Sequence, residues 1–422
     1  MLDYTREEAE RYGVASLRIV TYSRRGDRTK ILGDTCVGIT NALTRPLTEE
    51  ERKAGTVTPE IPPRIALTGT YDEIQDFFIG ERGRSKTGIP YAQWTDGLPI
   101  IPPTEEKVAE MLRGTSHAPD EVFPKPMPPA KWEFTIEKVA INGVMAGCKP
   151  DYMPVLLAMA EAMANEFTGA RAISTGGFGF MSVVSGPIAK EIGMNWGENF
   201  LNPGNPANAT LGRAMRLMFI NLGNYIPPNM TTSQGHPANY NCCFAENIWD
   251  SPWESLGEEH GFKRGENTIS ILWGMNYYNS FFISVHKYRY YRLLLPLIPI
   301  QIRQSEEPGS FGVILIPDMA KDLYDHGFKT KKDVKKWVWE NTTELWGERK
   351  IRQWGTKGPP RFRNAMAQQT GYRHWEDIPD HAIIHPLPRP EDLSIIVAGD
   401  GDEFGLAMQL LHCATVSIDK WR

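Results

Sequence analysis

The sequence predicts an α/β fold with a mixed, largely parallel sheet flanked by helices, preceded by an irregular, proline-rich N-terminal region. Two observations support this prediction. From Trp132 onward, short β-type segments alternate with segments of helical periodicity. A continuous apolar segment at 311–317 precedes two helical segments, and a second apolar segment follows at 394–399. Such apolar runs, separated by helices, are typical of buried parallel strands joined by crossover connections.

The first 125 residues are predicted to form an irregular α+β region. The expected elements are a helix at 5–11, a strand at 16–22, a polar surface loop at 44–64, a strand at 65–69 and a helix at 72–79. Thr104 is a favourable N-cap for a further helix that ends near Arg113, because Glu105 and Glu106 suit its first turn. Five prolines between 117 and 131 indicate a domain boundary there.

Residues 126–422 are predicted to form the main α/β domain, either as one body or as two lobes at 126–300 and 301–422. The expected strands are 133–141, 180–185, 242–246, 269–274, 311–317 and 394–399. The expected helices are 151–167, 189–192, 207–222, 319–326 and 330–346.

Charge and cysteine content narrow the class of protein. With 46 Lys and Arg against 51 Asp and Glu, the net charge of −5 disfavours a nucleic-acid partner. The most apolar long stretch, 277–302, contains four basic residues, so no membrane span is expected. Five cysteines and an acidic start predict a cytoplasmic protein with reduced thiols. The aromatic residues of 277–291 favour a homo-oligomer.

Cys148 is the leading candidate nucleophile. It follows two small residues at the end of the strand expected at 133–141, and Pro150 suits the first position of a helix. Free N–H groups at that helix end, together with Lys149, would lower the pKa of the thiol. The alternative is a small buried cysteine at a tight turn.

The segment 242–247 is the second candidate. In a strand, residues 242, 244 and 246 share one face, while Cys243 and Asn247 lie on the other. Glu246 suits general acid/base work better than thiolate activation, because a neighbouring carboxylate raises a thiol pKa. The alternative is a core strand that ends in a capped carboxylate.

The segment 202–213 is the third candidate. Gly, Asn and Pro lead into a helix, where Asn208, Arg213 and backbone N–H groups could hold an anion. A helix–helix contact explains the same residues equally well. The acidic loop at 399–405 suits a cation or a hydroxylated ligand better than a nucleotide. Without Cys-x-x-Cys or His-Glu-x-x-His spacing, no metal site is predicted, and the sequence requires no cofactor.

Three stretches together resemble bacterial proteins related to the UGSC-like (seleno)protein family. They are TDGLPIIPPT at 95–104, VMAGCKP at 144–150, and CFAEN at 243–247 with SPWE at 251–254. The similarity covers roughly residues 90–275, with a weaker one at 395–399, and the UGSC segment itself is missing. The resemblance implies a shared pocket rather than a defined reaction, and it groups Asp96 with Cys148 and Glu246.

The sequence therefore favours a cysteine-dependent enzyme of hydrolase, lyase or thiol-redox type that acts on a small polar or anionic metabolite. Cys148 would react, Glu246 and Asp96 would be the acid/base candidates, and Arg213 would clamp the anion. Substrate contacts are expected from the following residues: Lys149, Asn208, Cys243 and Asn247. Three expected strands end at 147–148, 246–247 and 399–400. If these three ends converge, Cys148 and Glu246 should lie within roughly 10 Å of each other. The alternatives are a metal-dependent enzyme and a non-catalytic binding or scaffold subunit of a larger complex.

Overall fold

The computed structural model describes residues 9, 17–21, 27–53, 65, 67–84, 90–92, 94–165, 179–225, 239–274, 279–282, 290–304, 309–352, 360–400 and 404–422. The chain divides into two compact units, Met1–Gly69 and Thr70–Arg422. The domain boundary predicted at residue 125 thus falls inside the second unit. Within the described ranges, no helix combines the length and apolar character needed to cross a membrane.

The first unit is organised around α2 (Arg28–Thr44), which the sequence analysis did not predict. Asp27 caps this helix by accepting hydrogen bonds from two backbone N–H groups of its first turn. Arg18 donates to the carbonyl oxygens of Ala42 and Arg45 near the end of the helix and pairs with Glu51 of α3 (Glu49–Lys53). The helix predicted at 5–11 lies almost entirely outside the described residues, and 17–21 form no strand.

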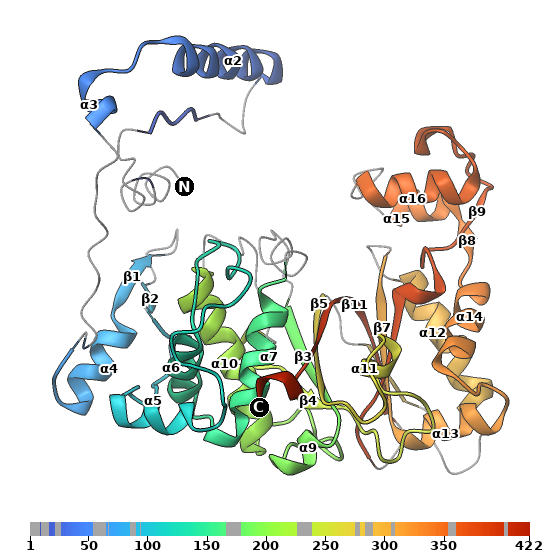
Figure 1. Ribbon diagram of the computed structural model, residues 1–422. Coiled ribbons are helices and arrows are strands. Elements are labelled where there is room, and N and C mark those ends of the chain that lie inside the picture. Colours follow the sequence, from blue (N-terminus) through green and yellow to red (C-terminus); the bar gives the residue numbers. More distant parts are fainter. Residues whose placement is uncertain are drawn as a thin grey trace. The chain divides into compact units, whose positions relative to one another are not determined.

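The second unit is built on a seven-stranded sheet in the order β10-β7-β11-β5-β3-β4, with β6 also paired to β11 (Figure 1). The strands are β3 (Gly179–Ser185), β4 (Cys243–Ala245), β5 (Thr268–Gly274), β6 (Asn279–Phe282), β7 (Phe311–Leu315), β10 (Leu393–Val397) and β11 (Phe404–Ser417). The α/β class is confirmed. The sheet is mixed rather than largely parallel, because only β3–β4 and β10–β7 pair in parallel among these strands.

The long strand β11 joins the two halves of the sheet. Its first half pairs with β6 and β7, and its second half pairs with β5, with a register shift between His412 and Ala414. Apolar residues of β3, β4, β5, β7, β10 and β11 meet in one buried cluster, so the sheet encloses part of its own core. We call this cluster the inner core.

Two groups of helices cover the outer faces of the sheet (Figure 1). The first group packs on β3, β4 and β5 and consists of α5 (Glu105–Leu112), α6 (Ile136–Ala146), α7 (Met153–Met163) and α10 (Pro206–Gly223). The second group packs on β7 and β10 and consists of α12 (Tyr290–Gln304), α13 (Pro317–Asp325) and α14 (Lys331–Asn341). We call the two apolar clusters beneath them the first and second outer cores.

Shorter elements complete the unit. Helix α4 (Tyr71–Ile79) precedes a hairpin of β1 (Glu81–Arg84) and β2 (Pro90–Ala92). Short helical turns are η1 (Pro150–Tyr152), α9 (Ile188–Glu191), α11 (Leu256–Glu259), η4 (Pro390–Asp392) and η5 (Asp419–Trp421). A small module with its own apolar cluster contains β8 (Glu344–Leu345), α15 (Trp346–Arg352), α16 (Pro360–Thr370), η3 (Trp375–Asp377) and β9 (Ile383–Ile384).

The strand predicted at 133–141 is wrong, because this segment belongs to α6. Thr135 caps the helix, and Ile136, Val139, Ala140 and Gly143 repeat with helical spacing on its buried side. Its apolar residues also fit a period of two over a few positions, which is why the sequence reads as a strand. Cys148 therefore follows a helix, not a strand.

Candidate functional site

The start of α10 is fixed by local capping. Asn205 accepts a hydrogen bond from the backbone N–H of Asn208, and Pro206 occupies the first helical position. Thr210, Arg213 and Arg216 follow at intervals of three residues, so they lie on successive turns of the helix. We call these three residues the α10 polar row.

Arg213 is neutralised inside the protein. Its Nε donates to Asp96 Oδ2 at 3.0 Å and its Nη2 to Asp96 Oδ1 at 3.0 Å, a bidentate pair that is largely buried. Nη2 also donates to the carbonyl oxygen of Pro99 at 2.7 Å. Gly97, with a φ of 91°, lets the chain turn between these two acceptors. Asp96 thus holds Arg213 and the 96–99 turn together.

Arg216 lacks such a partner. Among the described residues, its Nη1 is buried without a hydrogen bond, although its guanidinium lies over the ring of Tyr225, 4.5 Å from the ring centre. Burial lowers the pKa of Arg216, and Tyr225, Asp96 and Tyr240 offset that change in part. A buried donor without an acceptor is costly, so this end of the row is suited to receive an anion.

Cys148 lies at the other end of the row, and its predicted activation is wrong. Burial raises the pKa of Cys148 to about 12, while Thr210 and the charge of Arg213 offset the rise only in part. The 3₁₀ turn η1 that follows Lys149 runs directly into α7, and Lys149 itself is exposed. The thiol, which packs against the first outer core, is therefore protonated at neutral pH.

Cys243 lies on the same side of the sheet as Cys148. Cys243 and Ala245 belong to the first outer core, whereas Cys242 and Phe244 belong to the inner core. This is the alternation that the sequence predicts for the segment. Burial also raises the pKa of Cys243 to about 12, so both thiols are protonated at neutral pH.

Glu246 is the centre of a second, buried polar cluster. Its Oε2 accepts hydrogen bonds from Ser185 Oγ at 2.6 Å and from the backbone N–H of Leu256 at 2.8 Å. Its Oε1 lies 3.1 Å from Lys331 Nζ, and the side chains of this pair are 1% and 0% exposed. The capped carboxylate considered as the alternative is what the structure contains.

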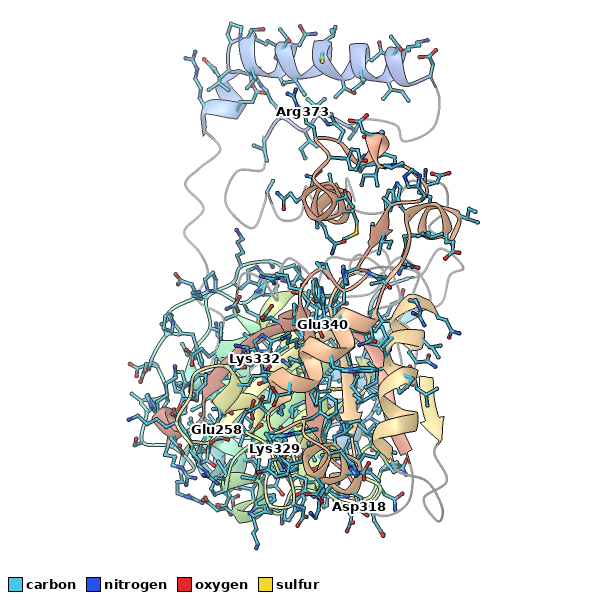
Figure 2. All side chains as sticks on the ribbon, turned by 90° about the vertical axis from the view of Figure 1, so that its right-hand side faces the viewer. Glu258, Asp318, Lys329, Lys332, Glu340 and Arg373 are labelled. Carbon is cyan, nitrogen blue, oxygen red and sulfur yellow. The ribbon has the colours of Figure 1, made fainter. Side chains whose placement is uncertain are left out.

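Further ionisable groups surround that pair. Glu259 lies 3.8 Å from Lys331 and also pairs with Lys335. His260 and His412 stack with their ring centres 3.6 Å apart, and burial lowers the pKa of both, that of His412 to about 3. Lys332 and Glu340, labelled in Figure 2, mark the two ends of α14, whose buried side carries Lys331 and Lys335.

The predicted residues thus fall into separate clusters. Cys148, Cys243, Asp96 and Arg213 lie with the α10 polar row, while Glu246 lies beyond β4 with Lys331. The sheet stands between the two clusters, so the structure does not bring Cys148 and Glu246 into one site. Lys331 carries no motif that could have identified it, because its role depends on how α14 meets the end of β4.

The two predicted asparagines hold loops at the edge of the sheet. Asn208 exchanges two hydrogen bonds of 3.0 Å with the backbone of Asn195. The backbone N–H of Asn247 donates to Val397 at 2.7 Å, and its amide donates to Gly399 at 3.4 Å. The ends of β4 and β10 therefore meet, whereas the third expected strand end, at 147–148, follows the helix α6. Most of the acidic loop at 399–405 lies outside the described side chains.

Comparison with known proteins adds no relative. No family model, no curated protein and no solved structure matches the chain. The resemblance to UGSC-like proteins therefore stays a prediction. Within the described ranges, no group of three or more His, Cys, Asp or Glu side chains is placed to hold a metal ion.

The raised pKa predicts how Cys148 is alkylated. Because only the thiolate reacts, labelling of Cys148 by iodoacetamide should accelerate by about tenfold per pH unit from pH 7 to pH 10. The exposed Cys36 should label first at pH 7. Peptide mapping of timed samples by mass spectrometry gives both rates, with urea-unfolded protein as the control. A Cys148 rate that levels off below pH 9 would contradict the prediction.

The buried ion pair between Glu246 and Lys331 predicts that substitutions of two neighbouring lysines, Lys331 and Lys332, change the stability of the protein by different amounts. Lys331→Met should lower the free energy of unfolding by about 3–5 kcal/mol, because it leaves the Glu246 carboxylate buried without a counter-ion. Adding Glu246→Gln should recover much of that loss, since the amide is neutral. Urea denaturation measures both. Lys332→Met, on the exposed side of α14, is the matched control and should change the free energy by less than about 0.5 kcal/mol. Equal effects of the two lysine substitutions would rule out the interpretation.

Proposed function

We propose that the protein is a cytoplasmic enzyme acting on a small anionic metabolite, with Arg216 holding the anionic group and Cys148 as the reacting thiol. The observation that carries this proposal is the buried Nη1 of Arg216, which has no hydrogen-bond acceptor in the part of the chain that the structure describes. Arg213 was the anion clamp expected from sequence. Its bidentate pairing with Asp96 makes Arg216 the better candidate.

The spacing of the polar row supports a small substrate. Six residues of helix rise about 9 Å, which is the separation along α10 between Thr210, the partner of Cys148, and Arg216. A metabolite of a few carbon atoms that carries a carboxylate or phosphate at one end spans this length. Binding would supply the acceptor that Nη1 lacks and would place the rest of the molecule toward the thiol.

The protonated thiol limits the chemistry. Asp96 is paired with Arg213 and Glu246 with Lys331, so neither carboxylate is placed to take the thiol proton. The base would then be a basic atom of the substrate. That atom accepts the proton from Sγ as the sulfur electron pair forms a bond to a carbonyl carbon of the substrate and the π electron pair of that carbonyl group moves to its oxygen. This favours the hydrolase or lyase type of reaction over thiol redox chemistry.

Substitution of Arg216 tests the proposal. Arg216→Met should weaken the binding of inorganic phosphate and succinate at least about tenfold, which corresponds to 1.4 kcal/mol. Its melting temperature should not fall, because the change removes a buried, incompletely bonded charge. Isothermal titration calorimetry and thermal unfolding measure the two effects. Arg264→Met, at an exposed position, is the control. Unchanged binding of both anions by Arg216→Met would overturn the proposal.

A second candidate function, a subunit that associates through α2, is favoured by one observation. Leu32, Cys36, Ile39 and Leu43 are all exposed, with values of 65%, 45% and 80% for Leu32, Ile39 and Leu43. Their spacing of four, three and four residues is that of a coiled-coil seam. The flanking positions Gly33, Thr35, Thr40 and Ala42 are uncharged, so a second copy of the helix meets no like charge there.

This seam predicts a dimer, which a disulfide bond between the two copies of Cys36 would reveal. Light scattering should give twice the chain mass of 47.6 kDa, and Ile39→Glu should return it to the single mass. Asn41→Glu, on the opposite side of α2, should leave the dimer intact. Mild oxidation should cross-link two copies through Cys36, and Cys36→Ser should prevent this. A wild-type mass near one chain would exclude self-association.

The sequence analysis expected an oligomer because of the aromatic segment 277–291. This segment lies largely outside the described residues.

A further inference from the structure

A pocket of about 240 Å³ lies among α4, α6, α10 and the residues before Asp96. Most of its wall is formed by the following apolar side chains: Phe78, Trp94, Ile141, Met145 and Leu222. Sites for drug-sized ligands are typically about 300–1,000 Å³, so this pocket suits a smaller molecule of one or two rings. Two aromatic residues in the wall favour a planar, aromatic occupant.

A chain of amide hydrogen bonds leaves one acceptor unused at this pocket. The backbone carbonyl of Lys138 can only accept, and Asn142 Nδ2 donates to it at 2.9 Å. Asn142 must therefore turn its oxygen to Asn221, whose Nδ2 donates to it at 2.8 Å. Asn221 Oδ1 is then left buried without a hydrogen-bond partner in the described ranges of the chain. Asn142 and Asn221 both line the pocket, so a ligand in it lies beside this unused acceptor.

We infer that this pocket binds a compact aromatic molecule that donates one N–H or O–H group to Asn221 Oδ1. The apolar wall takes the ring, and the amide chain fixes its orientation. The amide orientation makes the recognition specific, because the Lys138 carbonyl fixes the direction of the whole chain. An aromatic molecule without a donor would leave the acceptor unsatisfied, as it is without any ligand. Neither Cys148 nor Arg216 lines this pocket, so the inference stands apart from the proposed function.

Indole and 1-methylindole form a matched pair of probes, because they differ at the N–H group. Calorimetric titration of the full-length protein should show indole binding at least about tenfold more tightly than 1-methylindole. Asn221→Leu should abolish this difference. Ile141→Trp should weaken the binding of both probes, because the larger side chain fills the pocket. Leu201→Trp adds the same side chain at an exposed position and should leave both affinities unchanged.

Circular dichroism and thermal unfolding of each variant separate loss of the pocket from loss of the fold. Equal affinities of wild-type protein for indole and 1-methylindole would overturn the inference, as would the absence of indole binding at millimolar concentration. Unchanged indole binding by a folded Ile141→Trp variant would place the ligand elsewhere and would overturn it as well.

Discussion

The ion pair between Glu246 and Lys331 is the interaction on which the arrangement of the second unit depends. Glu246 follows β4, Ser185 ends β3, Leu256 begins α11 and Lys331 begins α14. The Glu246 carboxylate bonds to all three of the other residues. One buried carboxylate thereby connects one half of the sheet to the helices that cover the other half. Removing Lys331 leaves the Glu246 carboxylate without its counter-ion in a place that water does not reach.

The same constraint explains why the sheet can enclose a core of its own. The inner core needs β3 and β4 to approach β7 and β10, although β5 and β11 lie between them in the pairing order. The length of β11 allows this, because its first half pairs with β6 and β7 and its second half pairs with β5, where the register shifts between His412 and Ala414. The bond from Asn247 to Val397 then joins the ends of β4 and β10 directly.

The sequence predicted most regular elements of the second unit, but not those that depend on tertiary context. The helix at 207–222 and the strands at 180–185 and 311–317 appear close to their predicted bounds as α10, β3 and β7. β11 was missed, because its sequence lacks the alternation of a half-buried strand. The helix α12 was missed because Pro296 and Pro299 interrupt its pattern. The segment at 133–141 was predicted as a strand because a short apolar segment fits both the two-residue period of a strand and the 3.6-residue period of a helix.

The candidate site shows a similar limit. Residue type and spacing identified Cys148 and Arg213, and the family resemblance added Asp96. These three residues do lie in one region. Their protonation and pairing could not be read from the sequence, because burial and neighbours decide them. Asp96 and Arg213 form an ion pair with each other, so neither side chain is free to act as an acid, a base or an anion-binding group. The same pairing leaves Arg216, three residues further along α10, as the guanidinium with an unused buried donor. An anion that binds there would supply the acceptor that Nη1 lacks, which is why we propose Arg216 rather than Arg213 as the anion-binding residue.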